Sequence, residues 1–197
     1  MEELQHCEIL KTNINVTNMS DTIKYIGGHL DDLRGKYICV SNVHTTVMSY
    51  ENEEYRKIQN GAAMALPDGA PLSSYSRRKG YKQAQRVTGP DLMLELFAIS
   101  KEKGYRHYFY GATEETLQSM KEVLERDYPG IQIAGMYAPP FRALTPQEDA
   151  QIVAKINESR PDFIWIGLGA PKQEEWMYQH MGQLQGVLTV SYTHLTL

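Results

Sequence analysis

Short apolar runs alternate along this chain with longer segments in which apolar residues recur at helical spacing. Short runs of β-branched and apolar residues are typical of strands, whereas the helical recurrence is typical of amphipathic helices. Their regular alternation predicts parallel strands that are joined by helices. Strands are expected at residues 8–10, 13–16, 36–41, 63–66, 105–110, 131–136, 163–168 and 187–190.

Capping residues and prolines mark where the intervening helices begin and end. Ser20 is expected to cap a helix whose apolar face carries residues 23, 26, 30 and 33. The whole pattern predicts a Rossmann-like, doubly wound α/β fold: a mostly parallel sheet flanked by helices in a single domain, with ligands at the carboxyl ends of the strands. Further helices are expected from Asn52 to Gly61, from Pro90 to Gly104, and from a capping box at Thr145–Glu148 to just before Pro161.

The composition fits one ordinary globular domain. Of the 197 residues, 42% are hydrophobic and 22% are charged, which argues against disorder and coiled coil. The net charge of −4 provides no overall field that would attract nucleic acid, so no nucleic-acid partner is expected. Cys7 and Cys39 are too few for a disulfide framework, and Cys39 is expected to pack as a small apolar side chain. No signal peptide or membrane-spanning run is evident, which indicates a soluble protein that is at most peripheral to a membrane.

The first candidate for chemistry is Asp68, which follows the predicted strand at 63–66. Pro67 and Gly69 on either side of it fix a tight turn that holds the carboxylate at the carboxyl edge of the sheet. A carboxylate in that position can act as a general base toward a substrate hydroxyl. The alternative is a structural turn in which Asp68 bonds to its own backbone, and the spacing alone favours this alternative.

A second candidate is the segment that leads into the helix predicted near residue 90. Arg86 and the Thr88 hydroxyl lie just before Gly89 and the helix start, where free backbone N–H groups bind anions such as phosphate. In the structural alternative, Asp91 complements the helix dipole and Arg86 pairs with it at the surface. The pattern supports the two interpretations equally.

The third candidate is the turn that follows the strand predicted at 163–168. Gly167 and Gly169 let a ligand approach the backbone, and Pro171 then starts a helix. This is not the dinucleotide fingerprint, because Lys172 stands where that motif has its third glycine. A nicotinamide oxidoreductase is therefore disfavoured.

Lys172 makes the same turn a candidate phosphate site. A cation in the first turn of a helix opposes the positive end of the helix dipole, so its presence there indicates an anion between them. Gln173 completes this turn. In the alternative, Lys172 pairs on the surface with Glu174 or Glu175.

Other polar residues lie at the end of the strand predicted at 36–41. Ser41 is the last residue of this strand, and Asn42 and Thr45 follow it. All three are candidate ligand contacts. The segment from Gly135 through Tyr137 to Phe141 is expected to form a rigid, proline-containing loop whose aromatic residue either stacks on a base or packs in the core. No metal-ligand motif is present, so neither a metal nor a cofactor is expected.

Two phosphate-suited helix starts and one well-held carboxylate at one sheet edge predict a nucleotide-diphosphate ligand. Four motifs carry a more specific resemblance: Leu-Pro-Asp-Gly-x-Pro, Arg-Val-Thr-Gly-x-Asp-Leu, Pro-Pro-Phe and Gly-Leu-Gly-Ala-Pro-Lys-Gln-Glu-x-Trp. In this order and spacing they resemble the WecG/TagA/CpsF family of bacterial glycosyltransferases, over a range from about Glu8 to Val190.

The resemblance implies inverting, metal-independent transfer of N-acetylmannosamine or a related sugar from a UDP-sugar donor. The implied acceptor is a polyprenyl-diphosphate-linked sugar, undecaprenyl-diphosphate-linked N-acetylglucosamine, in teichoic acid or surface-polysaccharide biosynthesis. The resemblance also implies Asp68 as the catalytic base, a cytoplasmic enzyme peripheral at the inner face of the cell membrane, and a capacity to form homo-oligomers. Substrate contacts are then expected at Ser41, Asn42, Thr45, Arg86, Thr88, Gly89, Asp91, Tyr137, Gly167, Gly169, Pro171, Lys172 and Gln173.

The chain departs from the family pattern in two places. Many members read Thr-x-Asn where this chain reads Ser41-Asn42-Val43-His44-Thr45. Members also continue beyond a strand like that at 187–190 into a basic amphipathic tail, whereas this chain reads Ser191 to Leu197. We therefore expect residues 1–190 to form the catalytic core and residues 191–197 to be an atypical C-terminal end without the membrane-facing tail. Such a core is expected to bind UDP and to transfer poorly, and a nucleotide-binding or scaffolding protein of the same fold is the alternative function.

Overall fold

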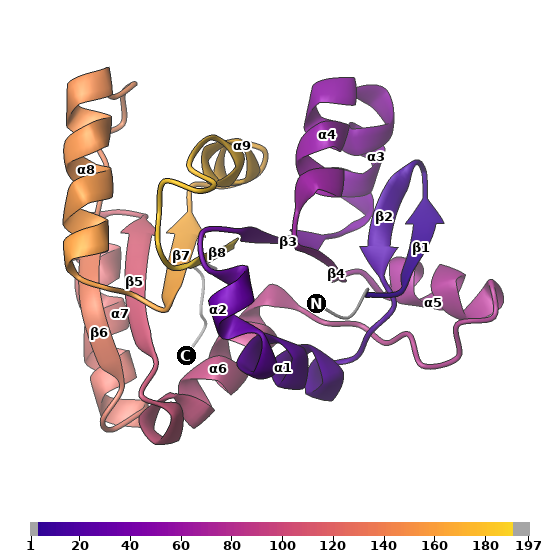
Figure 1. Ribbon diagram of the computed structural model, residues 1–197, viewed down its shortest axis with the longest axis horizontal. Coiled ribbons are helices and arrows are strands. Elements are labelled where there is room, and N and C mark those ends of the chain that lie inside the picture. Colours follow the sequence, from indigo (N-terminus) through magenta and orange to yellow (C-terminus); the bar gives the residue numbers. More distant parts are fainter. Residues whose placement is uncertain (1–3, 191–197) are drawn as a thin grey trace.

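A parallel sheet forms the centre of the molecule, whose structure, a computed structural model, is described here for residues 4–190 (Figure 1). The sheet has six strands in the spatial order β4-β3-β8-β7-β5-β6, and every neighbouring pair is parallel. The predicted Rossmann-like α/β architecture in a single domain is confirmed. The strands are β3 (Tyr37–Ser41), β4 (Met64–Pro67), β5 (Arg106–Gly111), β6 (Gln132–Tyr137), β7 (Phe163–Gly167) and β8 (Val187–Val190).

A hairpin lies beside this sheet. Its strands, β1 (His6–Ile9) and β2 (Thr12–Asn15), pair antiparallel and form a separate two-stranded sheet. The side chain of Asn15 accepts a hydrogen bond from the backbone N–H of Ala65, which attaches the hairpin to β4. The predicted strands at 8–10 and 13–16 therefore exist, but outside the parallel sheet.

Helices cover both faces of the sheet, and β7 shows why. Phe163 and Trp165 point into one apolar cluster, whereas Ile164 and Ile166 point into the other. Successive strand side chains face opposite sides, so an uninterrupted apolar run is what a strand covered on both faces requires. One cluster is completed by the hairpin, α4 (Glu53–Gly61), α8 (Pro146–Glu158) and α9 (Lys172–Gln179), and the other by α1 (Met19–Gly28), α2 (Leu30–Leu33), α6 (Gly89–Lys103) and α7 (Glu114–Asp127).

The first helical segment differs from its prediction. Asn18, not Ser20, is the N-cap, because its side chain accepts the backbone N–H of Asp21 at 3.0 Å. The single helix expected through residue 33 is also divided at His29, where the backbone leaves helical geometry. Gly27 and Gly28 immediately precede the break, and glycine is a poor helix former.

The other predicted helix boundaries are confirmed. Asn52 caps α4, which ends at Gly61. The α6 helix ends at Gly104, whose φ of +71° is the left-handed conformation that glycine adopts readily. Thr145 forms the predicted capping box at the start of α8. The remaining helices are α3 (Val43–Glu51), between β3 and α4, and α5 (Ala70–Arg78), after β4.

Candidate active site at the carboxyl edge of the sheet

The predicted site residues lie mainly on loops that leave the carboxyl ends of β3, β4 and β7. All strands of the sheet are parallel, so these ends share one edge. Strands β4 and β7 are three positions apart in the sheet, which corresponds to about 14 Å at ordinary strand spacing. A ligand that contacts both the β4 and the β7 turns must therefore be extended.

Asp68 occupies a turn that is fixed by backbone hydrogen bonds. Its N–H donates to the carbonyl of Ser41 at 2.8 Å, which ties the turn to the end of β3. The neighbouring Pro67 carbonyl accepts the N–H of Val87 at 2.9 Å, which ties it to the segment before α6. The side chain of Asp68 is 13% exposed to solvent. The carboxylate is thus held in place without being sealed from solvent.

Arg86 binds this same turn. Its Nε donates to the Asp68 carbonyl at 2.7 Å, and its Nη2 lies 3.4 Å from the Asp68 carboxylate. The alternative in which Arg86 pairs with Asp91 is therefore wrong. Two of the N–H groups of Arg86 are used in these contacts, and the guanidinium carries more than two. The side chain is 57% exposed, so the remaining donors face solvent beside the carboxylate.

Thr88, Gly89 and Asp91 build the start of α6. The Thr88 side chain accepts the N–H of Asp91 at 3.0 Å and is the N-cap. Thr88 and Gly89 are buried, whereas Asp91 is exposed. The Thr88 hydroxyl therefore has a structural role, and ligand contacts by these three residues stay a prediction.

Ser41, Asn42 and Thr45 end β3 and begin α3. Asn42 and Thr45 form a capping box, with the Asn42 carboxamide accepting the Thr45 N–H at 3.1 Å and the Thr45 hydroxyl accepting the Asn42 N–H at 2.9 Å. Ser41 is fully buried and donates to Gln59 Oε1 at 2.8 Å. The Ser41 hydroxyl thus points into the protein rather than toward a ligand, and Asn42 is the half-buried residue of the three.

The turn after β7 has the open backbone that its glycines predicted. Gly169 has a φ of +77°, a conformation that favours glycine, and a side chain built there would meet no atom within 4 Å. Gly167 is half-buried, and its carbonyl accepts the N–H of Ala112. Pro171, which was expected to be the first helical residue, is instead the N-cap of α9, so the helix begins one residue later, at Lys172. The backbone of this turn is therefore accessible.

Lys172 and Gln173 begin α9 with different surroundings. Lys172 is exposed and makes no ion pair with any residue between 4 and 190. The surface pair with Glu174 is excluded because Glu174 is only 1% exposed. Gln173 is buried, and its Oε1 accepts the Gly169 N–H at 3.1 Å, so that this side chain closes the turn.

Glu174 is the residue that sequence reasoning missed. Burial raises the pKa of its carboxyl to about 7, and a hydrogen bond from Gln173 opposes that shift. A strongly shifted pKa beside a ligand edge often marks a functional residue. The only signal in the sequence was its place after Gly-x-Pro-Lys-Gln, since an acidic residue in a first helical turn is otherwise ordinary.

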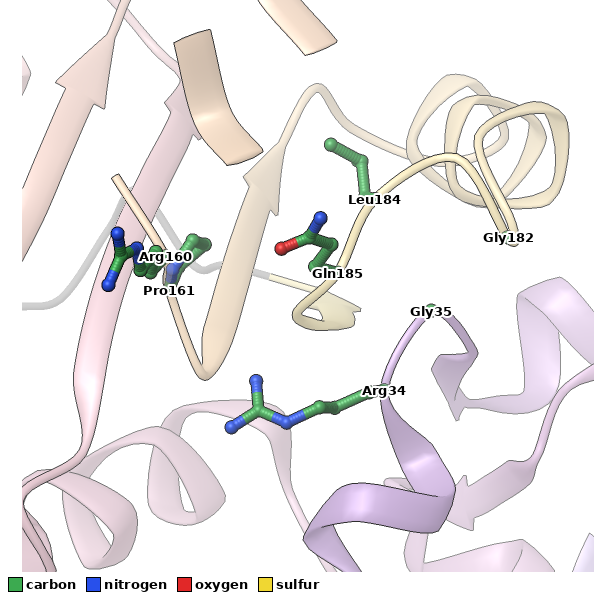
Figure 2. Close-up of a pocket in the computed structure, with 7 residues that line it drawn as sticks. All are labelled: Arg34, Gly35, Arg160, Pro161, Gly182, Leu184 and Gln185. Atoms are coloured by element: carbon green, nitrogen blue, oxygen red, sulfur yellow. The ribbon is translucent and has the colours of Figure 1, made fainter. Parts of the chain in front are cut away.

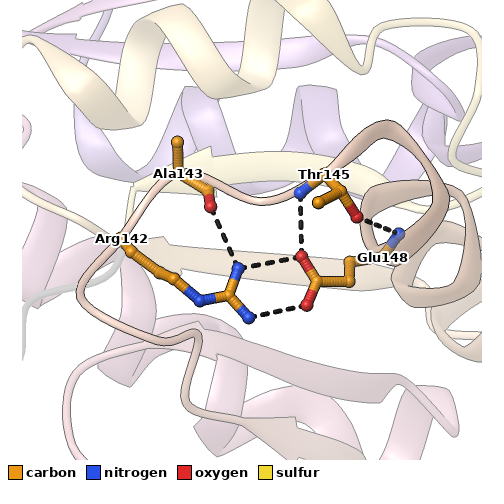
Figure 3. Close-up of polar contacts among 4 residues, drawn as sticks. All are labelled: Arg142, Ala143, Thr145 and Glu148. Carbon is orange, nitrogen blue, oxygen red and sulfur yellow. Dashed lines mark hydrogen bonds and ion pairs between the residues drawn. The ribbon is translucent and has the colours of Figure 1, made fainter.

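The segment after β6 consists of a strand end and an anchored loop. Gly135 and Tyr137 belong to β6, so the loop is shorter than expected; Tyr137 is half-buried and stacks on Tyr110 with ring centroids 5.9 Å apart. Arg142 binds Glu148 through two hydrogen bonds of 2.6 and 2.9 Å, as Figure 3 shows.

Phe141 lies in this anchored loop and is 93% exposed. Packing of Phe141 in the core is therefore wrong, whereas Tyr137 does contact another aromatic ring. Arg142 and the Thr145 capping box hold the ends of the loop, and Pro139 and Pro140 restrict its backbone. The exposed ring is thus presented on a restrained segment.

A hollow in the described part of the chain lies elsewhere. It has a volume of about 520 Å³ and is lined by residues that precede β3, β7 and β8, among them Arg34, Pro161 and Gln185 (Figure 2). It therefore lies at the amino edge of the sheet, opposite the candidate site. The Arg34 guanidinium beside it is already paired with Asp162 at 2.6 Å and with Asp31 at 3.2 Å.

Two features are absent from residues 4–190. No group of three or more His, Cys, Asp or Glu side chains in this range is placed to hold a metal ion. No helix in it has the length and apolar character needed to cross a membrane. The predictions for residues 191–197 lie outside the described residues.

Comparison with known proteins identifies the chain's relatives. A model of the glycosyl transferase WecG/TagA/CpsF family matches residues 7–192. The chain belongs to this family. Its membership agrees with the four motifs, three of which lie on the turns described above: Asp68 after β4, Arg86 before α6, and the Gly167–Trp176 segment.

Two curated relatives have the same name, N-acetylglucosaminyldiphosphoundecaprenol N-acetyl-beta-D-mannosaminyltransferase. The one from Bacillus spizizenii is 30% identical over 152 residues, which are 77% of this chain and 57% of the relative. The one from Staphylococcus aureus is 25% identical over 183 residues, which are 92% of this chain and 70% of the relative. The chain thus spans just over half the length of the first relative. A solved structure of an ABC transporter substrate-binding protein from Desulfitobacterium hafniense matches 90% of this chain and 52% of its own chain. The sequence identity is 16% and the TM-score is 0.37, so this likeness does not bear on fold or function.

Proposed function

We propose that this family member transfers N-acetylmannosamine, or a related sugar, from a UDP-sugar to undecaprenyl-diphosphate-linked N-acetylglucosamine. The names of both relatives contain this sugar and this acceptor. The observation that carries the proposal is the Asp68 carboxylate, which Arg86 and the ends of two strands hold at the ligand edge of the sheet. The proposed pathway is the biosynthesis of teichoic acid or another surface polysaccharide.

Asp68 is proposed as the general base. Its carboxylate takes the proton of the acceptor hydroxyl as that oxygen forms a bond to the anomeric carbon. The bond between the anomeric carbon and the diphosphate oxygen breaks on the opposite face, and its electron pair leaves with UDP. One displacement of this kind inverts the anomeric configuration. The partial exposure of Asp68 supports the role, because the acceptor must reach the carboxylate from solvent.

Arg86 and Lys172 are proposed to stabilise the charge of the departing diphosphate. Lys172 has no ion-pair partner in the range 4–190, and its helix start adds the positive end of a dipole. Arg86 retains exposed N–H groups beside Asp68. Cations and helix starts of this kind perform the task that a divalent metal performs in other transferases. Transfer is therefore proposed to be metal-independent.

The separation of the two turns supports an extended donor. Asp68 and the Gly169–Gln173 turn lie on strands that are about 14 Å apart. A single phosphate cannot contact both, whereas a nucleotide-sugar is long enough to extend from one turn to the other. The exposed backbone at Gly169 supports close approach of the diphosphate.

The test is transfer from UDP-N-acetylmannosamine to a soluble lipid-diphosphate-linked N-acetylglucosamine. We expect an inverted product and equal rates with and without a chelator such as EDTA. Calorimetry with UDP measures binding separately from transfer. Binding without transfer would support the nucleotide-binding alternative, and absence of both would contradict the proposal.

Peripheral association with the cytoplasmic face of the membrane is proposed with this function, because the acceptor is attached to a lipid. The exposed ring of Phe141 supports such contact, since an aromatic side chain on a restrained loop can insert among lipid headgroups. Sedimentation with anionic lipid vesicles tests this, and Phe141→Ser is expected to reduce the bound fraction. An unchanged bound fraction would exclude Phe141 from the contact.

A further inference from the structure

Five polar side chains are buried together behind the candidate site, where α9 packs against α4 and β3. The Ser41 hydroxyl donates to Gln59 Oε1 at 2.8 Å, and Gln59 Nε2 donates to the Tyr55 hydroxyl at 3.1 Å. From α9, Gln173 Nε2 donates to Glu174 Oε1 at 3.1 Å. All five are at most 9% exposed, and we call them the buried polar cluster. Its two parts, one at the end of β3 and one on α9, are linked by the electrostatic interaction between Tyr55 and Glu174.

Glu174 is the unusual member of this cluster. Its Oε2 has no hydrogen-bond partner among residues 4–190, and the residue is 1% exposed. The titratable groups that interact with Glu174 are Tyr55 on α4, Cys39 on β3 and the adjacent Glu175. Strands β7 and β8 carry no titratable side chain. None of these groups is a cation. Within residues 4–190 this buried carboxyl therefore has no counter-charge, an arrangement that stability alone does not favour.

The orientation of the Gln173 carboxamide gives Glu174 a role. With its Nε2 directed to Glu174, Gln173 must direct its Oε1 away, and that oxygen accepts the Gly169 N–H at 3.1 Å. The Gln173 N–H also donates to the Gly169 carbonyl at 3.0 Å. Rotation of the carboxamide would place an N–H group against the Gly169 N–H. The acceptor at Glu174 thus determines which conformation of the turn is stable.

We propose that Glu174 is a positioning residue whose buried carboxylate orients Gln173 and thereby fixes the Gly169–Gln173 turn for the donor diphosphate. For the donor, the inference rests on the proposed function; for the turn itself, it rests only on the contacts above. A hydrogen bond to an ionised carboxylate is stronger than one to a protonated carboxyl. The turn is therefore held more firmly when Glu174 is ionised.

A dependence on pH near neutrality follows. Burial raises the pKa of Glu174 to about 7, so the carboxyl loses its proton as the pH rises through this value. The diphosphate of a UDP-sugar is esterified at both ends and keeps a constant charge over the same range. We therefore expect the donor to bind more tightly at pH 8 than at pH 6, and Glu174→Gln to remove this dependence.

The first measurement needs no substrate. The ¹⁵N–¹H resonance of Gly169 in the full chain is followed from pH 5.5 to pH 8.5. In the wild type we expect it to shift with a midpoint near pH 7, and in Glu174→Gln we expect no such midpoint. Glu175→Gln is the matched control, because its carboxylate is adjacent but exposed. It should keep the transition with a slightly lower midpoint. A wild-type Gly169 resonance that does not move, or that moves equally in Glu174→Gln, would overturn the proposal.

The second measurement separates binding from chemistry. At pH 8, Glu174→Gln is expected to raise KM for the UDP-sugar roughly fivefold, while kcat changes by less than about twofold. Glu175→Gln should leave both constants as in the wild type. An equal loss of kcat and kcat/KM would mean that Glu174 acts in the transition state, and would contradict a positioning role. If no UDP-sugar bound at all, the proposed function would fail, and the Gly169 titration would still decide the role of Glu174.

Discussion

Two carboxylates serve the same edge of the sheet under opposite conditions. Asp68 lies in a turn, keeps part of its exposure and has the Arg86 guanidinium 3.4 Å away. Glu174 lies in a helix, is almost completely buried, and interacts with no cation among residues 4–190. The first can be reached from solvent, as the base role proposed for it requires, whereas the second can only act on its protein neighbours.

The difference in burial suits the two carboxylates to different roles. A general base must reach its substrate, so partial exposure is part of the role proposed for Asp68. A group that orients others gains from burial, because hydrogen bonds in a low-dielectric interior are stronger. An acidic residue at this edge is therefore not by itself a candidate base, and the two roles predict different responses to removal of the charge.

Replacement of Asp68, the partly exposed carboxylate, should have the largest effect. Asp68→Asn keeps the size of the side chain but removes the proton acceptor, so we expect kcat for transfer to fall by about 100-fold or more. UDP-sugar binding, measured by calorimetry, should stay within a few-fold of the wild type. Asp32→Asn, an exposed aspartate on α2, serves as the control. A kcat for Asp68→Asn equal to that of the control would remove Asp68 from the chemistry.

Arg86 binds the Asp68 turn and is proposed to contact the donor, so its replacement should have the next largest effect. Arg86→Gln loses both contacts to Asp68 and a cation for the diphosphate, so we expect kcat/KM to fall by about 10-fold to 100-fold. Arg86→Lys keeps the charge but not the forked geometry and should recover only part of the loss. The measurement is steady-state transfer at fixed ionic strength. Full recovery with lysine would show that charge alone matters.

The contrast between the carboxylates also explains what the sequence could predict. Asp68 is recognisable because proline and glycine beside an acid specify a turn that follows a strand. Every predicted strand exists, because short apolar runs separated by helical patterns leave few alternatives. These features depend on neighbours along the chain, which a sequence displays directly.

Features that depend on distant residues could not be predicted. Ser41 was expected to contact a ligand, but its hydroxyl donates to Gln59 on a later helix. In the sequence, Glu174 is indistinguishable from an ordinary acidic residue in a first helical turn. It is buried only because α9 packs on α4 and β3. The break at His29 was missed for a local reason, since two glycines weaken a helix whose apolar pattern continues.

The pH dependence of stability tests the buried carboxylate directly. The folded protein holds the Glu174 proton up to about pH 7, whereas the ordinary value of 4.5 applies to the unfolded chain. Between these values the folded state binds more protons, so the free energy of unfolding falls as the pH rises, by up to about 3 kcal/mol from this group. Glu174→Gln should lack this contribution. Urea unfolding of both proteins at pH 5 and pH 8 measures the difference, and equal pH dependence would show that Glu174 is not buried as described.

The smallest effect is expected at a third carboxylate, Glu148, whose side chain is 36% exposed and yet strongly paired. Arg142, through two hydrogen bonds, and the Thr145 N–H lower the pKa of Glu148 to about 2 (Figure 3). Exposed ion pairs contribute little to stability even when their geometry is good, because water competes for both charges. Glu148→Gln should therefore speed hydrogen exchange of the Thr145 amide while transfer changes by less than about twofold. A larger loss of transfer would mean that the 138–145 loop contacts a substrate, and exposure would then no longer separate catalytic from supporting carboxylates at this edge.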